Sequence, residues 1–381
     1  MNTPPLSDLT AAVAERVRQA HATGAALRIT GAGHWLDAGR PCRTEEPLPL
    51  ASHAGIVEYE PGDLTMTVRA GTPLEALRDV ARAEGQWLPL DPFGHPGGTI
   101  GATIATASSG PLSAAFGTPR DHVLGCEFIT GTGEVVRAGG RVVKNVAGFD
   151  LVRLVTGSWG TLGVLTEVSI RLRALPEVER TLALETTAGE ARRWIRASEY
   201  TPLAAEMLSA GLATAMGIGS RDTLLLRLGG NRALVQAAGE SAGALASCRD
   251  VDNSVWDALR ACEPEGAAVI RLSTSSSQVA ALWDRVASIV ERAGGLAHAT
   301  LQRGVVRCML PVQSGDADEL ARLRGIVGAL LTLGSSVVER LPSPLWAAMV
   351  ASAASDALSI GARRAFDPGH VLNPGILGES A

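Results

Sequence analysis

The chain has 381 residues, enough for two or three domains with cores of ordinary size. Its 34 lysines and arginines and 39 acidic residues give a formal net charge of −5 with no basic tract, so no nucleic-acid partner is expected. The five cysteines are scattered, without CxxC or Cys/His spacing. This pattern predicts neither a metal site nor a disulfide framework, and it favours a reducing compartment.

The N-terminal segment carries no recognisable targeting signal. Leu6–Leu27 has the periodicity of an amphipathic helix, but charged residues interrupt the apolar core that a signal peptide requires. A transmembrane helix needs a run of about 18 apolar residues, and the sequence has none. We therefore expect a soluble cytoplasmic protein.

The first part of the chain, to about residue 176, is rich in glycine and in short strands. Apolar alternation predicts the strands, and helical periodicity predicts one clear helix. The expected elements are a helix at Leu74–Glu84 and strands at Leu27–Thr30, Ile56–Tyr59, Thr65–Ala70, Val123–Ile129, Glu134–Ala138 and Val164–Arg173. In the last strand Val168, Ile170 and Leu172 share one face.

The second part, residues 177–340, alternates strands with longer helices. Its C-terminal half predicts the order β-α-β-β-α-β, at Ala268–Ser273, Ser277–Gly294, Leu296–Leu301, Val305–Leu310, Asp316–Leu331 and Ser336–Arg340. A weaker copy precedes it, at Thr181–Glu185, Ala188–Ser198, Leu203–Leu208, Leu224–Leu228 and Leu234–Ala246. We interpret the copies as two ferredoxin-like units that share one antiparallel sheet, with helices on one side.

The last segment, residues 341–381, is expected to hold a helix at Trp346–Ile360 and a tail with two Pro-Gly turns. Pro368-Gly369 and Pro374-Gly375 lie close together near the end of the chain. Such turns indicate a tail pinned to the body of the protein, and a simple terminal turn is the alternative.

Three glycine-rich stretches are candidates for binding. They are Gly31-Ala32-Gly33-His34, Gly97-Gly98-Thr99-Ile100-Gly101 and Gly157-Ser158-Trp159-Gly160-Thr161-Leu162-Gly163. Glycine lets backbone N–H groups approach an anion such as a pyrophosphate, although a single glycine-rich stretch is more often just a turn. Neither a Walker motif nor a GxGxxG after a first strand is present, so an ordinary site of either kind is disfavoured. Together the three loops predict convergence on one long cofactor.

Several longer motifs resemble a known family. The runs Tyr59–Thr65, Leu88–Pro92 and Gly98–Gly101 look like the FAD-binding domain of the p-cresol methylhydroxylase/vanillyl-alcohol oxidase superfamily. Arg120–Gly125, Gly139–Leu154, Phe366–Pro368 and Leu372–Gly375 are similar to the FAD-binding subunit of bacterial glycolate oxidase. The matches cover about residues 56–176 and 364–377, and the middle of the chain matches only in element order.

The resemblance implies an α+β fold. Residues 1–176 would form a two-subdomain FAD-binding domain of the p-cresol methylhydroxylase (PCMH) type, and residues 177–340 a ferredoxin-like antiparallel-sheet cap. Residues 341–381 would return to pack on the FAD domain.

The cofactor implied is FAD, held largely by backbone loops. The residues that would bind it are Gly31, Ala32, Gly33, His34, Trp35, Pro89, Asp91, Gly97, Gly98, Thr99, Ile100, Gly101, Ser108, Ser109, Arg120, Asp121, Lys144, Asn145, Gly160, Leu162, Gly163, Val164 and Asn373. Lys144 and Asn145 are equally well explained as residues that hold their loop in place.

The first loop departs from the family pattern of three glycines followed by Ser or Thr and Lys. Ala32, His34 and Trp35 replace three of those residues. Some relatives carry a histidine here that bonds covalently to the flavin, and His34 has the chemistry to do the same. A non-covalent loop histidine is the alternative.

Oxidation of a 2-hydroxy acid needs a cation for the carboxylate, a base for the hydroxyl proton and a flavin near the C–H bond. Arg303 and His298 are the candidate catalytic residues, with Arg307 on an adjacent strand. Solvated or structurally paired side chains are the alternative. The sequence has no His-x-His with a following acidic residue, so the metal-assisted substrate site of D-lactate-type relatives is not expected.

Three functions follow. The first is the FAD subunit of a glycolate-oxidase-type complex, with a second flavoprotein subunit, an iron–sulfur subunit and peripheral membrane association through the complex. Any iron–sulfur cluster would lie on another chain, since this one has no cysteine pattern for it. The second is a self-sufficient FAD oxidase or dehydrogenase of another small hydroxy acid or alcohol. The third is a flavin-free assembly subunit.

Overall fold

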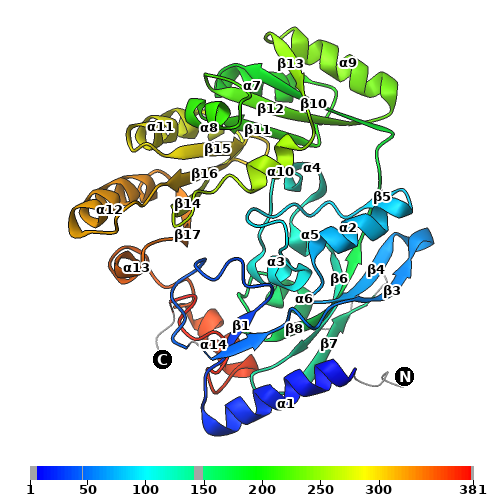
Figure 1. Ribbon diagram of the computed structural model, residues 1–381, viewed down its shortest axis with the longest axis vertical. Coiled ribbons are helices and arrows are strands. Elements are labelled where there is room, and N and C mark those ends of the chain that lie inside the picture. Colours follow the sequence, from blue (N-terminus) through cyan, green and yellow to red (C-terminus); the bar gives the residue numbers. More distant parts are fainter. Residues whose placement is uncertain (1–6, 45, 141–148, 379–381) are drawn as a thin grey trace.

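The computed structural model describes residues 7–44, 46–140 and 149–378. Figure 1 shows the first half of the chain in the lower part of the molecule and a large sheet above it. The last helix returns to the lower part, beside the first strand. Among the described residues no helix is both long and apolar enough to cross a membrane.

The N-terminal elements form a small layer with the C-terminal tail. They are α1 (Asp8–Thr23), β1 (Arg28–Thr30) and β2 (Pro47–Pro49). The Ser7 side chain accepts a hydrogen bond from the N–H of Thr10 at the start of α1, and Gly24 ends the helix with a φ of 70°. β1 pairs in parallel with β2, and Leu27 forms a parallel bridge with Leu372 of the tail. The segment that follows α1 and the C-terminal tail therefore lie side by side at β1.

A five-stranded antiparallel sheet forms the centre of the first half. Its order is β3-β4-β8-β6-β7, with β3 (Ile56–Glu60), β4 (Thr65–Arg69), β6 (Val123–Ile129), β7 (Val135–Gly139) and β8 (Val164–Arg171). Val168, Ile170 and Leu172 are fully buried on one face, which confirms the predicted alternation. Leu77 of α2 and Ile104 of α3 pack into the same cluster.

Short helices and two further strands complete this half. They are η1 (Pro61–Asp63), α2 (Leu74–Ala83), β5 (Gln86–Trp87), α3 (Ile100–Thr106), α4 (Ser113–Phe116), α5 (Pro119–His122), α6 (Leu151–Val155) and β9 (Arg173–Ala174).

An eight-stranded antiparallel sheet forms the second half, and it contains the predicted duplication. The first copy is β10 (Val178–Glu185), α7 (Ala188–Ala197), β11 (Ala204–Leu208), β12 (Thr223–Gly230), α9 (Arg232–Gly243) and β13 (Cys248–Val251). The second copy is β14 (Ala268–Ser273), α11 (Val279–Arg292), β15 (Leu296–Thr300), β16 (Val305–Leu310), α12 (Ala317–Leu331) and β17 (Ser335–Arg340). The strand order β13-β10-β12-β11-β15-β16-β14-β17 joins the copies through β11 and β15, the equivalent strand of each.

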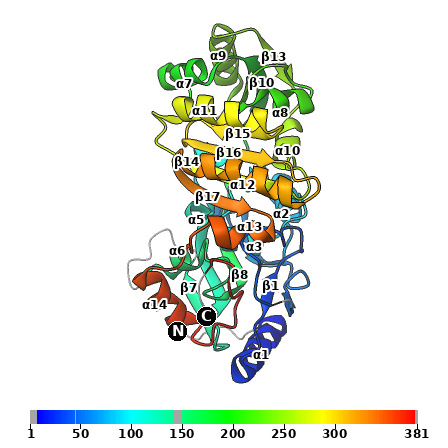
Figure 2. The same ribbon diagram turned by 90° about the vertical axis from the view of Figure 1, so that its left-hand side faces the viewer.

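The helices do not all lie on one side of this sheet, so the prediction of a single helical face was incomplete. α7, α9, α11 and α12 pack on one face, which Figure 2 views from the helix side. Two short helices, α8 (Ala210–Ala215) and α10 (Val255–Arg260), lie on the other face. Apolar residues such as Val269 and Met309 point to that face, and Leu212, Trp256 and Leu259 cover them.

The C-terminal segment holds two helices where one was predicted. They are α13 (Ser343–Met349) and α14 (Ala357–Phe366). The chain leaves helical geometry at Val350, and the side chain of Asp356 accepts two backbone N–H bonds that start the second helix. Beyond α14 the buried carboxylate of Asp367 accepts from the N–H groups of Val371 and Leu372. The tail is therefore pinned, as its turns predicted.

Candidate functional site

A pocket with about 1160 Å³ of empty space, part of it open to solvent, lies in the first half of the molecule. β1, the loop after it, α3, the loop before β8 and the C-terminal tail surround the pocket. It brings together twelve of the predicted cofactor residues: Gly31, Ala32, Gly33, His34, Trp35, Gly98, Thr99, Gly101, Ser108, Gly160, Gly163 and Asn373. The three glycine loops thus converge on one cavity.

The first loop offers backbone donors to the pocket. Within the described part of the chain, the N–H groups of residues 31–34 have no hydrogen-bond partner. A Cβ at Gly31 would lie 2.4 Å from Oγ1 of Thr99, which is buried. Only glycine permits this approach of the first loop to the second. The arrangement is that of an anion-binding backbone nest.

The second loop forms a wall of the pocket and offers few free backbone hydrogen-bond donors to it. The N–H groups of Gly97, Gly98, Ile100 and Gly101 already bond to protein acceptors. The Thr99 side chain accepts from the N–H of Ala102 at the start of α3. A Cβ at Gly101 would lie 2.6 Å from that of Ala70, so α3 can pack closely against the end of β4.

The third loop is held by the tail. Asn373 accepts a hydrogen bond from the N–H of Ile29 at 2.7 Å and donates one to the carbonyl of Trp159 at 2.8 Å. Trp159 has a φ of 56°, an uncommon conformation for a bulky residue, and the hydrogen bonds of its N–H and C=O hold it there. One side chain therefore ties β1, the third loop and the C-terminus together at the pocket.

Other predicted cofactor residues do not line the pocket. Gly97, Ile100, Ser109, Leu162 and Val164 are neighbours of lining residues. Arg120 and Asp121 are exposed in α5, where Asp121 caps the helix through Thr118. Lys144 and Asn145 lie outside the described residues.

Pro89 and Asp91 are buried in the loop between β5 and α3, just before the lining residue Pro92, and neither lines the pocket. The Asp91 carboxylate accepts a hydrogen bond from the N–H of Leu112. Burial raises the pKa of Asp91 to about 6, against the opposing effects of that hydrogen bond and of Arg260, Arg227 and Arg78. The geometry is that of a structural carboxylate that orders two loops.

The raised pKa of Asp91 predicts a pH-dependent stability. The folded chain binds the Asp91 proton more tightly than the unfolded chain does. Protonated Asp91 therefore makes its full contribution to the free energy of unfolding below about pH 4, and this contribution is lost as the pH rises through about 6. Above that, ionised Asp91 costs about 3 kcal/mol. Asp91→Asn keeps an acceptor for Leu112 and is expected to raise the melting midpoint near pH 8 but not near pH 4. The exposed Asp79→Asn on α2 is the control, and an equal shift at both pH values would contradict the account.

Several lining residues were not predicted. Arg28, Phe93, His95 and Trp159 all border the pocket. His95 stacks on His34 with a ring distance of 3.8 Å, and Trp159 lies parallel to Trp35 with ring centroids 6.3 Å apart. Trp159 lies inside a recognised glycine loop, so it could have been found from sequence. The other three required knowledge of the tertiary contacts.

The two candidate catalytic residues lie outside the pocket lining. Arg303 is exposed in the hairpin between β15 and β16, where its guanidinium donates to the carbonyl of Ser113. His298 is buried on β15, with Nδ1 2.8 Å from a carboxylate oxygen of Glu206. Both are thus engaged with protein partners.

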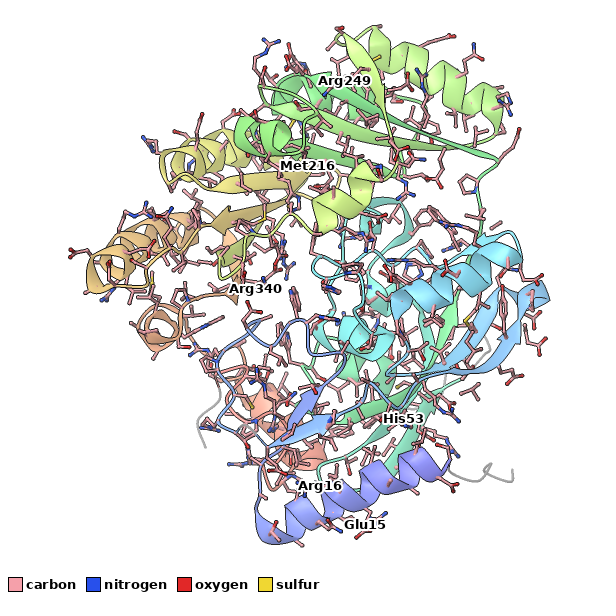
Figure 3. The ribbon with its side chains drawn as sticks, viewed as in Figure 1. Glu15, Arg16, His53, Met216, Arg249 and Arg340 are labelled. Carbon is pink, nitrogen blue, oxygen red and sulfur yellow. The ribbon has the colours of Figure 1, made fainter. Side chains whose placement is uncertain are left out.

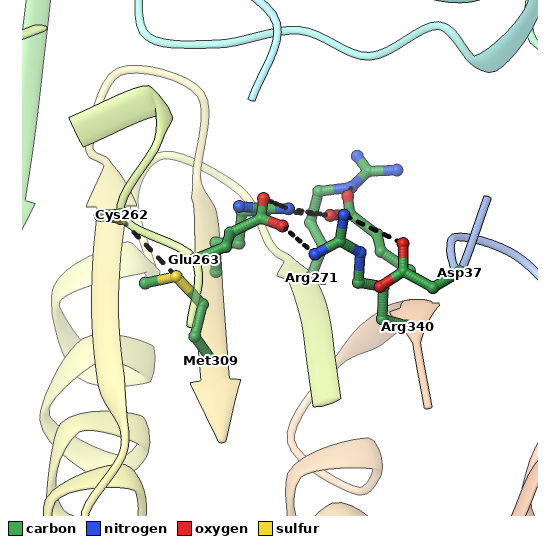
Figure 4. A network of polar contacts seen from close by, with 8 residues as sticks. Asp37, Cys262, Glu263, Arg271, Met309 and Arg340 are labelled. Carbon is green, nitrogen blue, oxygen red and sulfur yellow. Dashed lines mark hydrogen bonds and ion pairs between the residues drawn. The ribbon is translucent and has the colours of Figure 1, made fainter. Parts of the chain in front are cut away.

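A network of arginine and acidic side chains extends from the eight-stranded sheet to the loop after β1 (Figure 4). Arg307 is buried and pairs with Glu263 and Glu339. Burial alone lowers the pKa of Arg307, but the two carboxylates outweigh burial and raise it. Arg340 pairs with Glu263 and with Asp37 from the loop after β1.

Arg340 lies at the junction of the eight-stranded sheet and the first loop, as Figure 3 shows. Its guanidinium stands 5.6 Å from the Trp35 ring centroid. The eight-stranded sheet is therefore coupled to Trp35, a residue that lines the pocket.

Comparisons with known proteins agree with this geometry. Residues 8–139 match a family model described as an FAD binding domain. The chain is 37% identical to glycolate oxidase subunit GlcE of Escherichia coli (strain K12) over 255 residues, which are 66% of this chain and 69% of that protein. The chain belongs to the GlcE family.

Further matches extend the family likeness. The chain is 40% identical over 147 residues to glycolate oxidase subunit GlcD of Bacillus subtilis (strain 168), which is 38% of this chain and 31% of GlcD. A solved structure of alkyldihydroxyacetonephosphate synthase superposes with a TM-score of 0.71 over 98% of this chain and 77% of that one. At 17% identity that match concerns the fold alone, and it supports the two-subdomain α+β architecture.

The pocket fits the FAD for which the matched domain is described. FAD joins a pyrophosphate to two ring systems, and the pocket is bordered by three separate glycine loops. Its unpartnered N–H groups suit the anion, and its aromatic and apolar walls suit the rings. FAD is thus the cofactor that the residues present would hold.

Proposed function

We propose that this chain is the FAD-binding subunit of a glycolate-oxidase-type complex, which oxidises glycolate, a 2-hydroxy acid, to glyoxylate. The observation that carries the proposal is the convergence of three glycine loops on one pocket in a chain of the GlcE family. When bound, FAD supplies an acceptor for the two electrons that leave the alcohol carbon.

The first loop would hold the pyrophosphate through the N–H groups of Gly31, Ala32, Gly33 and His34. Thr99 fixes the distance between the first two loops, and Asn373 closes the site from the tail. The contacts of the first loop would be made by backbone N–H groups, so they tolerate the replacement of the usual loop residues by Ala32, His34 and Trp35.

The cap supplies no exposed acid–base pair at the pocket. Arg303 is bonded to Ser113, and His298 to Glu206. This favours turnover in a complex over turnover by the isolated chain. We therefore propose a second flavoprotein subunit and an iron–sulfur subunit as partners, with any membrane association peripheral and made through the complex.

The test is glycolate-dependent reduction of a dye by the co-expressed complex and by the isolated chain. The complex is expected to turn over at least roughly tenfold faster than the chain alone, and omission of this chain is expected to abolish activity. Full turnover by the isolated chain would instead indicate a self-sufficient oxidase. A complex that works equally well without bound FAD in this chain would indicate an assembly role.

A further inference from the structure

Three polar side chains lie side by side on the face of the eight-stranded sheet opposite its long helices. Glu206 of β11, His298 of β15 and Arg307 of β16 are each no more than 2% exposed. His298 and Arg307 stand directly opposite each other in the strand register. Their sequence neighbours point into the core on the helical face, so the three side chains project from the other face.

Each of these side chains keeps one buried polar atom without a hydrogen-bond partner. The atoms are Oε1 of Glu206, Nε2 of His298 and Nη1 of Arg307. Buried polar groups are nearly always paired, so three such atoms on neighbouring strands call for an explanation. Together they offer a proton acceptor and a guanidinium donor, the two groups that a 2-hydroxy acid needs.

Phe93 separates these side chains from the flavin pocket. Its ring lines the pocket, whereas Glu206, His298 and Arg307 do not. The ring centroid lies 4.8 Å from that of His298 and 4.5 Å from the Arg307 guanidinium carbon.

The backbone beside Phe93 is fixed. The N–H of Gly94 donates to the carbonyl of Arg260 at 2.8 Å, and a Cβ at Gly94 would lie 3.1 Å from the Trp35 indole nitrogen. The ring therefore forms a packed wall between the pocket and the three polar groups.

We propose that Phe93 is a specificity-determining residue that keeps small 2-hydroxy acids away from His298 and Arg307 in this subunit. A phenyl ring and a glycolate ion are of similar size. Removal of the ring would leave room for a glycolate ion beside the flavin pocket. Its carboxylate would lie against Arg307 and its hydroxyl group against His298. The proposal rests on the proposed function, and it explains why the isolated chain should not oxidise glycolate.

The test uses the FAD-loaded chain without partner subunits. Oxalate, a planar carboxylate that cannot be oxidised in the same way, is titrated while the flavin spectrum is recorded. The wild-type spectrum is expected to stay unchanged, and Phe93→Ala is expected to bind oxalate at least roughly tenfold more tightly. Phe93→Leu, which keeps an apolar wall, should behave as the wild type.

Anaerobic glycolate provides a second readout. Oxidation of glycolate would release a hydride from the alcohol carbon, which bound FAD would accept, and a hydroxyl proton, which His298 would accept. Bleaching of the flavin is therefore expected in Phe93→Ala and not in the wild type, and Phe93→Ala combined with His298→Gln should lose it. Phe93→Val replaces Phe93→Ala if the smaller residue prevents folding.

The proposal is overturned if the wild-type chain binds oxalate as tightly as Phe93→Ala does. It is equally overturned if glycolate bleaches the wild-type flavin as readily as the flavin of Phe93→Ala. It is also overturned if a folded, FAD-loaded Phe93→Ala or Phe93→Val chain does neither. Failure of the proposed function would look different: the chain would hold no FAD, or the complex would show no glycolate-dependent turnover whatever residue stands at position 93.

Discussion

Replacing Gly31 by alanine is expected to weaken FAD binding by at least a hundredfold, or about 3 kcal/mol. The new Cβ would lie 2.4 Å from Oγ1 of Thr99, which is buried and caps the first turn of α3. The first loop must therefore move away from the second, and its four N–H groups lose their common orientation. FAD content after purification and the dissociation constant for added FAD measure the effect.

Gly361→Ala is the matched control. Gly361 lies in α14, and nothing stands within 4 Å of a Cβ built there. Alanine also has the higher helix propensity, so this variant should bind FAD as the wild type does and be slightly more stable. A Gly31→Ala chain that retains full FAD content would mean that the first loop does not hold the cofactor.

Replacing Asp367 by alanine is expected to cost about 3–5 kcal/mol of folding free energy. The carboxylate is fully buried, accepts from the N–H groups of Val371 and Leu372, and pairs with Arg363 at 2.9 Å. Its removal leaves both N–H groups without their acceptor in the interior. Asn373, which closes the pocket, directly follows Leu372, so loss of the pinned tail should also release FAD. Denaturant midpoint and FAD retention are the measurements.

Asp356→Ala provides the comparison for that effect. Asp356 also accepts two backbone N–H bonds, but at the exposed start of α14. Loss of such a cap costs about 1 kcal/mol. Equal midpoints for the two variants would show that the tail is not held by Asp367.

Much of the fold is visible in the sequence because its signals are local. Alternation located the central strands, and the repeated β-α-β-β-α-β order revealed the duplication. β13 was not predicted, since its four residues show no buried alternation. The two C-terminal helices were merged into one because the cap at Asp356 is a single side chain within a continuous helical pattern.

The site could be predicted where close approach of the backbone requires glycine, because glycine-rich stretches are visible in the sequence. The three loops that converge on the pocket were all recognised in this way. Asp91 was predicted to bind the cofactor because its motif is a family signature, yet it lies buried against Leu112. The contact of Phe93 with His298 and Arg307 joins residues about two hundred positions apart, and no local pattern encodes such a contact.

The most direct measurement is the ratio of FAD to protein in the purified wild-type chain, before and after incubation with added FAD. Binding in the three-loop pocket predicts a yellow protein with about one FAD per chain. A colourless chain that takes up no FAD on incubation would contradict the central claim and leave an assembly role for the fold.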